Sequence, residues 1–126
     1  MKQALILRAD ANAGIGNGHL MRSLALAQAW QRLGGRSMLV TSVAPDALPP
    51  SVRTSDMEFA FVPSPHPDPA DVSFVRQLLR DSGNAWACCD GYHFDADYTQ
   101  SLAGSARGVV VIDDIAQAPL YRADVI

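Results

Sequence analysis

Short, mostly apolar runs alternate along the chain with segments whose apolar residues recur at helical spacing. The runs are strand-length and nearly continuous in their apolar character, which is typical of parallel strands covered on both faces. They fall at residues 4–7, 37–41, 59–62, 86–89 and 109–112, and a sixth opens at residues 124–126. The pattern therefore predicts a sheet whose strands are separated by helices.

Helical segments are expected between these runs, at residues 20–33, 71–80 and 95–102. The first is rich in strong helix formers and ends at Gly34 and Gly35. Prolines leave room for at most a short helical turn within residues 44–55, and they make residues 63–69 a loop. This alternation predicts an α/β fold, a three-layer Rossmann-like parallel sheet.

In such a sheet, ligands bind beyond the carboxyl ends of the strands. That rule singles out residues 9–19, the segment after Thr41, residues 90–93, and the pair Asp113 and Asp114.

Composition narrows the class of protein. The 126 residues are enough for one domain, and 48% of them are hydrophobic, an ordinary value for a globular chain. A formal net charge of -3 argues against nucleic acid as a partner. No apolar run is long enough to span a membrane, no signal peptide is visible, and the adjacent Cys88 and Cys89 resemble buried thiols. We therefore expect a cytoplasmic protein.

The most informative segment is a glycine-rich turn between the first strand and the first helix. It consists of Gly14, Ile15, Gly16, Asn17 and Gly18. Glycines next to a helix N-terminus favour an anion site. The dinucleotide fingerprint is not met, because a histidine stands at position 19 and no acidic residue follows the second strand. No P-loop is present either, so the sequence predicts no cofactor.

His19 admits two interpretations: it packs or caps the start of the helix, or it acts as an acid or base. Histidine is suited to proton transfer near neutral pH, and a helix N-terminus disfavours its charged form. Arg22 and Ser23 follow at helical spacing and should share its face. Asp10, after the first strand, is expected to orient the ring or a bound sugar.

Further acidic residues follow the later strands. Asp90, His93, Asp95 and Asp97 suggest a metal cluster, but helix capping and solvated charge explain this pattern better, so no metal is predicted. Asp113 and Asp114 either line the cleft or cap a turn or helix.

Six segments resemble one family. Residues 8–10, 14–19 and 22–27 look like the opening of the PseG/SpsG family of UDP-sugar hydrolases of pseudaminic acid biosynthesis. Residues 90–93, 111–114 and 123–126 resemble its later strand ends, although Ile115 departs from the family's usual residue.

The resemblance implies the amino-terminal domain of a two-domain GT-B enzyme similar to the MurG glycosyltransferases. It implies metal-independent attack of water on the anomeric carbon of a UDP-linked deoxyamino sugar, with His19 as the base. The expected substrate-binding residues are Asp10, Gly14, Ile15, Gly16, Asn17, Gly18, Arg22, Asp90, Tyr92, His93, Asp113 and Asp114.

Residues 1–126 would then lack the carboxyl-terminal UDP-binding domain, and the chain alone is expected to be inactive. Its unfinished sheet edge, or the face that the second domain would cover, offers a surface for self-association. Two alternatives stay open: a glycosyltransferase domain that passes the sugar to an acceptor, and a non-catalytic domain that binds a nucleotide sugar.

Overall fold

The computed structural model describes residues 3–11, 16–91 and 94–112, which form one parallel sheet flanked by helices. The strands are β1 (Ala4–Ala9), β2 (Arg36–Thr41), β3 (Glu58–Phe61), β4 (Trp86–Asp90) and β5 (Gly108–Ile112). The helices are α1 (Gly18–Arg32), α2 (Pro50–Arg53), α3 (Pro69–Ser82) and α4 (Ala96–Ala103), with a 3-10 turn at Pro45–Ala47. The predicted three-layer α/β, Rossmann-like fold is confirmed. No helix in the described part of the chain is long and apolar enough to cross a membrane.

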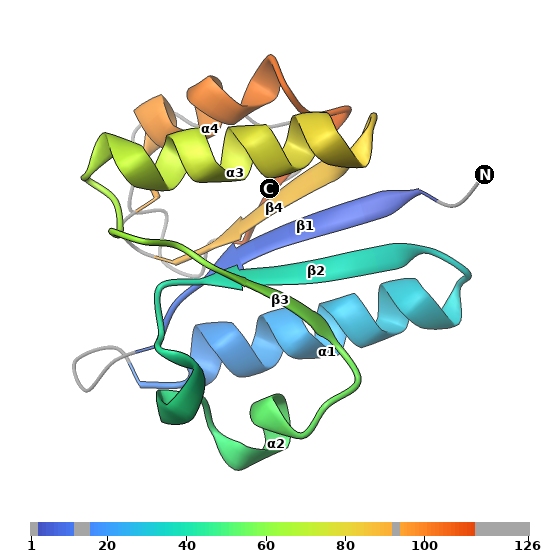
Figure 1. Ribbon diagram of the computed structural model, residues 1–126. Helices are drawn as coiled ribbons and strands as arrows, with labels where there is room; N and C mark the ends of the chain where they lie inside the picture. Colours follow the sequence, from blue (N-terminus) through green and yellow to red (C-terminus); the bar gives the residue numbers. More distant parts are fainter. Residues whose placement is uncertain (1–2, 12–15, 92–93, 113–126) are drawn as a thin grey trace.

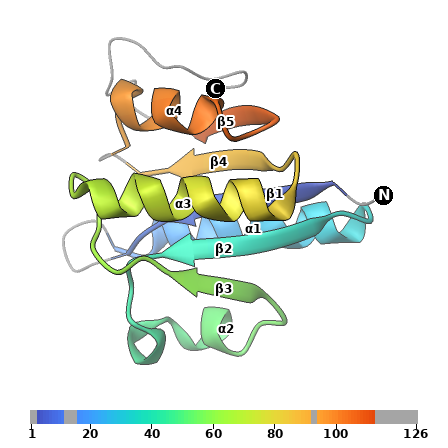
Figure 2. The ribbon, with the colours of Figure 1, turned by 45° about the horizontal axis from the view of Figure 1, so that its top comes forward.

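The strands lie in the order β3-β2-β1-β4-β5, and every neighbouring pair is parallel (Figure 2). From β1 the chain proceeds to β2 and β3 on one side. It then crosses to β4 and β5 on the other side. The strand order therefore changes direction between β1 and β4, and this is the topological switch point of the sheet.

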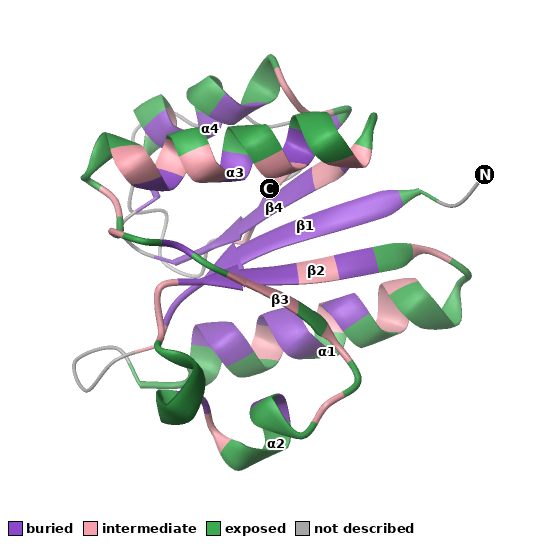
Figure 3. Cartoon of the chain, in the orientation of Figure 1, coloured by how far each residue is buried: buried purple, intermediate pink, exposed green. Residues whose placement is uncertain are grey.

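Helices cover both faces of the sheet. Helices α1 and α2 lie on one face, and α3 and α4 lie on the other (Figure 1). Strand β1 is buried along its whole length, whereas the edge strand β3 is partly exposed (Figure 3). The continuous apolar run of β1 is what a central strand with two covered faces requires.

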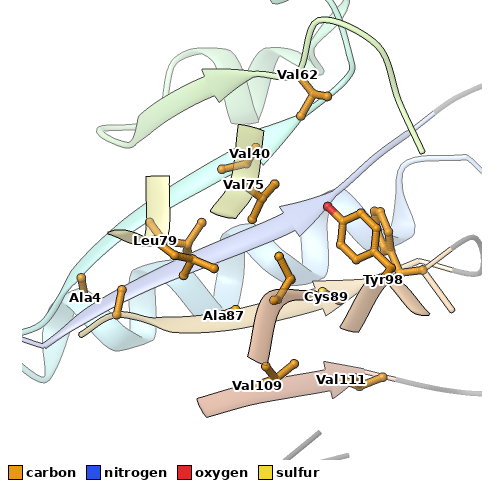
Figure 4. Close-up of a cluster of buried hydrophobic side chains, with 14 residues drawn as sticks. Ala4, Val40, Val62, Val75, Leu79, Ala87, Cys89, Tyr98, Val109 and Val111 are labelled. Carbon is orange, nitrogen blue, oxygen red and sulfur yellow. The ribbon is translucent and has the colours of Figure 1, made fainter. Parts of the chain in front are cut away.

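Each face has its own hydrophobic core, because successive side chains of a strand point to opposite faces. Cys89 packs with Val75 and Leu79 of α3 (Figure 4), in the core that also contains Ile6. Cys88 belongs to the core beneath α1. Tyr98 lies at the end of the first core toward which the strand arrows point (Figure 4).

Most element ends differ from the predicted ones by one or two residues. Helix α1 begins at Gly18 and not at residue 20, so His19 lies in its first turn. Helix α3 begins at Pro69, because proline suits a first helical position and the Asp68 side chain accepts a hydrogen bond from the Ala70 N–H (2.9 Å). The proline-rich stretch holds two short turns where at most one was expected. The sixth strand expected at residues 124–126 lies outside the described residues.

Candidate active site

The predicted site lies at the carboxyl edge of the sheet, at the switch point between β1 and β4. Ala9, the last residue of β1, is in register with Asp90, the last residue of β4. Crevices at such switch points are where open α/β sheets bind their ligands. The described beginnings of two predicted segments, Ala9 of residues 9–19 and Asp90 of residues 90–93, therefore meet at this place.

The glycine-rich turn is described from Gly16 onward and leads the chain into α1. Gly16 has a φ of 70°, which is unfavourable for residues with a side chain, so glycine has a conformational reason to be there. Gly18 is the first residue of α1, and the first turn of this helix contains no acidic residue. Gly14 and Ile15 lie outside the described residues.

His19 is paired with the carboxylate of Asp90. The distance between His19 Nδ1 and Asp90 Oδ1 is 2.8 Å, and both residues are buried. An ionised carboxylate oxygen can only accept a hydrogen bond, so we assign the ring proton to Nδ1, which makes Nε2 the acceptor nitrogen. The orienting role expected of Asp10 therefore belongs to Asp90.

Arg22 and Ser23 also contact Asp90, and both come from the face of α1 that carries His19. Arg22 Nε donates to Asp90 Oδ2 (2.8 Å), and its Nη2 donates to Oδ1. Ser23 Oγ donates to Oδ2 (3.3 Å). The shared face expected from helical spacing is thus confirmed, and we refer to His19, Arg22, Ser23 and Asp90 as the site cluster.

Asp10 belongs to a different group of polar residues, on the opposite face of the sheet. Arg8 donates through Nη2 to Asp10 Oδ2 (2.9 Å) and through Nη1 to Oδ1. Thr41 Oγ1 and the Ser42 N–H donate to Asp10 Oδ1, at 3.2 and 2.7 Å. Asp10 therefore ties the end of β1 to the segment that follows β2.

The same arginine binds a second carboxylate, that of Asp71 in the first turn of α3. Arg8 Nε donates to Asp71 Oδ1 (3.0 Å) and Nη2 donates to Oδ2 (2.7 Å). Tyr98 Oη donates to Oδ1 (2.6 Å), and the His66 N–H donates to Oδ2 (2.7 Å). We refer to Arg8, Asp10, Asp71 and Tyr98 as the arginine network.

Protonation in the arginine network follows from burial and from these bonds. Burial raises the pKa of Asp71, but the hydrogen bonds and charge of Arg8 outweigh it, so this pKa lies below its usual range. Burial raises the pKa of the Tyr98 hydroxyl far above its ordinary value. Burial lowers the pKa of Arg8, yet Asp71 and Asp10 more than compensate and keep it charged.

The sequence interpretation missed most of this network. Asp71 and Tyr98 were predicted only as helical residues, and Arg8 entered only as part of a resembling segment. A signal was present nonetheless: an arginine inside a buried strand must find carboxylates nearby. Which carboxylates these are depends on the strand order, which the alternating pattern does not specify.

Of the other acidic, tyrosine and histidine candidates at the strand ends, the structure describes only some. Asp95 accepts a hydrogen bond from the Tyr98 N–H (3.0 Å) and caps α4, as the capping interpretation expected. Among the described residues, no group of three or more His, Cys, Asp or Glu side chains is placed to hold a metal ion. Tyr92, His93, Asp113 and Asp114 lie outside the described residues.

The two cysteines are buried free thiols. Burial, followed by the charge of Asp90, raises the pKa of Cys88 to about 12, and burial raises that of Cys89 further. Both thiols are therefore protonated at neutral pH and are poor nucleophiles.

Comparisons with family models, with curated proteins and with solved structures found no match to this chain.

Proposed function

We propose that this chain carries the general base of a nucleotide-sugar hydrolase, and that the base is His19. The observation that supports this most is the hydrogen bond between His19 Nδ1 and the buried Asp90 carboxylate at the switch point of the sheet. A base that is oriented by a carboxylate in this way is a recurrent arrangement in hydrolytic enzymes. The resemblance to the PseG/SpsG family supplies the substrate class, a UDP-linked deoxyamino sugar.

In the proposed reaction, His19 Nε2 takes a proton from a water molecule while the water oxygen attacks the anomeric carbon. The bond between that carbon and the phosphate oxygen breaks, and its electron pair leaves with UDP. The imidazolium that forms is stabilised by Asp90, to which Nδ1 donates. The proton balance thus needs no group beyond the ring, its carboxylate and the water.

The start of α1 suits the diphosphate of such a substrate. Gly16 lets the backbone turn at positive φ, and the first helical turn offers N–H groups with no acidic side chain among them. Asp10 was expected to contact the sugar. Its bonds to Arg8, Thr41 and Ser42 instead favour a role in fixing the loop after β2.

Three parts of the proposal come from the sequence and the resemblance alone. They are a second domain that holds the uridine, a cytoplasmic location, and self-association through the sheet edge. The choice of water as acceptor has the same origin, since the His19–Asp90 pair would equally activate a sugar hydroxyl in a glycosyltransferase.

Release of UDP from UDP-sugars tests the proposal, with this chain and with the complete product of its gene assayed side by side. Replacing His19 by Gln should lower the rate by about 10²–10⁴-fold, the usual contribution of a general base. His66→Gln is the matched control, a histidine at the same sheet edge whose side chain contacts Asp95 and Tyr98. A loss of less than about tenfold in His19→Gln would remove the base assignment, and UDP release that requires an added acceptor would favour the transferase.

A further inference from the structure

The arginine network holds two loops that follow neighbouring strands. The Ser42 N–H, directly after β2, donates to Asp10 Oδ1 (2.7 Å). The His66 N–H, in the loop after β3, donates to Asp71 Oδ2 (2.7 Å). Both acceptors are carboxylates, and hydrogen bonds to charged groups are stronger than those between neutral groups. Each loop is therefore tied to a buried carboxylate by one of its backbone amides.

Arg8 connects the two carboxylates, because one of its nitrogens serves both. Its Nη2 donates to Oδ2 of Asp10 (2.9 Å) and to Oδ2 of Asp71 (2.7 Å). Its Nη1 completes a fork on Asp10, and its Nε completes a second fork on Asp71. The guanidinium is planar, so the directions of the two forks are fixed relative to one another. If the guanidinium turns to follow one carboxylate, its fork on the other is broken.

Burial gives the guanidinium a reason to turn when one carboxylate is lost. The Arg8 side chain is 1% exposed, and the centre of the Phe94 ring lies 5.0 Å from its central carbon. Its Nε donates to Asp71, and a buried donor that loses its acceptor is strongly disfavoured. Without the Asp71 carboxylate, Arg8 should therefore turn toward another acceptor and loosen its fork on Asp10.

We infer that Arg8 couples the loop after β2 to the loop after β3, so that a change in the order of one loop changes the order of the other. Both loops lie at the edge where a sheet of this kind binds its ligands. A ligand that holds one loop in place would thus stabilise the other through the arginine. The inference concerns the folded chain without substrate and does not depend on the proposed function.

A second connection between the loops has to be separated from this one. The Val62 N–H donates to the Thr41 carbonyl oxygen (2.9 Å), so β2 and β3 are also joined where the loops begin. This backbone contact would couple the loops without the arginine. Arg8→Lys distinguishes the two routes, because it keeps the charge and the backbone, but its single ammonium cannot form two planar forks.

Native-state hydrogen exchange of the Ser42 and His66 amides measures the coupling in the chain alone. Asp71→Asn offers one acceptor oxygen in place of two, so it should speed exchange at His66 directly. Through Arg8 it should also speed exchange at Ser42, by about fivefold or more, the lower end of the usual coupling between two sites. Asp10→Asn is the reciprocal variant and should speed exchange at His66 by a comparable factor.

Two controls separate the coupling from a general loss of stability. Ala27 is buried in the middle of α1, on the opposite face of the sheet, and exchange at the loops is taken relative to its amide. Asp56 is an exposed aspartate outside the arginine network, so Asp56→Asn should change neither loop.

The route is tested by adding Asp71→Asn to the Arg8→Lys variant. Exchange at Ser42 should then change by less than about twofold, the limit within which independent changes add. Adding Asp71→Asn to Asp10→Asn gives the same test without altering Arg8, and it again should leave Ser42 unchanged.

Unchanged or slower exchange at Ser42 in Asp71→Asn would overturn the inference. So would a rise at Ser42 that persists in the Arg8→Lys or Asp10→Asn background, because the backbone contact would then carry the coupling. If Asp71→Asn does not fold, exchange at His66 in Asp10→Asn decides in its place. UDP release is not measured in any of these variants, so the proposed function and this inference can fail independently.

Discussion

The site cluster and the arginine network lie on opposite faces of the same sheet edge, and each is built around an arginine that binds carboxylates. In the network, the Arg8 side chain is 1% exposed, and its three nitrogens all donate to Asp10, Asp71 or backbone carbonyls. In the site cluster, the Arg22 side chain is 36% exposed, and the carboxylate it holds also orients a histidine. In the first arrangement the arginine is held by carboxylates and carbonyls of the buried rim, whereas the second places a histidine at the switch point of the sheet.

This difference indicates which of the two clusters is the better candidate for a role in a reaction. Five segments converge on the arginine network: the ends of β1 and β2, the loop after β3, and helices α3 and α4. This convergence indicates that the arginine network stabilises the fold and fixes the segments at the carboxyl edge of the sheet. Among the described residues, the site cluster joins α1 and β4, and it contains the histidine that we propose as the base. The following predictions test this division from the largest expected effect to the smallest.

Arg8→Met should lower the free energy of unfolding the most. It leaves two buried carboxylates without their cation, and breaking a buried ion pair in this way costs about 3–5 kcal/mol. Arg22→Met should cost less, because the Arg22 side chain is 36% exposed and its loss removes the arginine from one carboxylate, not two. Urea unfolding of both variants measures the difference, with Arg32→Met, at an exposed arginine in the last turn of α1, as the control. Equal losses in the two variants would erase the proposed division of roles.

Tyr98→Phe removes one donor to Asp71 and leaves the other donors in place. We expect a loss of about 1.5 kcal/mol in the free energy of unfolding, a typical value for a hydrogen bond to a charged group. UDP release should keep its rate at temperatures where the variant is folded. A rate loss as large as that of His19→Gln would show that the network takes part in the chemistry.

Acid should weaken the network through Asp71. Its pKa in the folded chain is below the ordinary value, so below about pH 4 the unfolded state binds the proton first. The stabilisation is therefore complete above about pH 4 and is lost as the pH falls through the folded-state pKa, by at most about 1.4 kcal/mol per pH unit. Asp71→Asn should show a shallower pH dependence than the parent. Asp56→Asn is the control, because Asp56 is an exposed aspartate outside the arginine network. If Asp71→Asn left the pH dependence of the free energy of unfolding unchanged, the proposed contribution of Asp71 to acid stability would be contradicted.

Much of the fold was predictable because its signals are local. Apolar runs gave all five described strands, and helical spacing gave α1, α3 and α4. The shared face of His19, Arg22 and Ser23 follows from the helical repeat alone. The end of β4 was also predicted to reach the ligand-binding edge, because parallel strands share one carboxyl edge.

The pairings between distant segments were not predictable in the same way. Asp90 is 71 residues from His19, and Asp71 is 63 residues from Arg8. The first pairing requires that β4 lie next to β1. The second requires that α3 lie on the face of the sheet opposite α1 (Figure 1). The alternation of strands and helices is compatible with several strand orders, so it left open whether Asp10 or Asp90 would face the histidine.

The most direct test of this account is the tautomer of His19, which imidazole nitrogen NMR shifts report in the chain without any substrate. The account predicts a neutral ring protonated at Nδ1, with that proton donated to Asp90 and with Nε2 as the basic nitrogen. The contrary result is a ring protonated at Nε2, whose Nδ1 would accept from Arg22 Nη2, 3.1 Å away. That tautomer would leave Nε2 unable to take a proton from water and would remove His19 as the base.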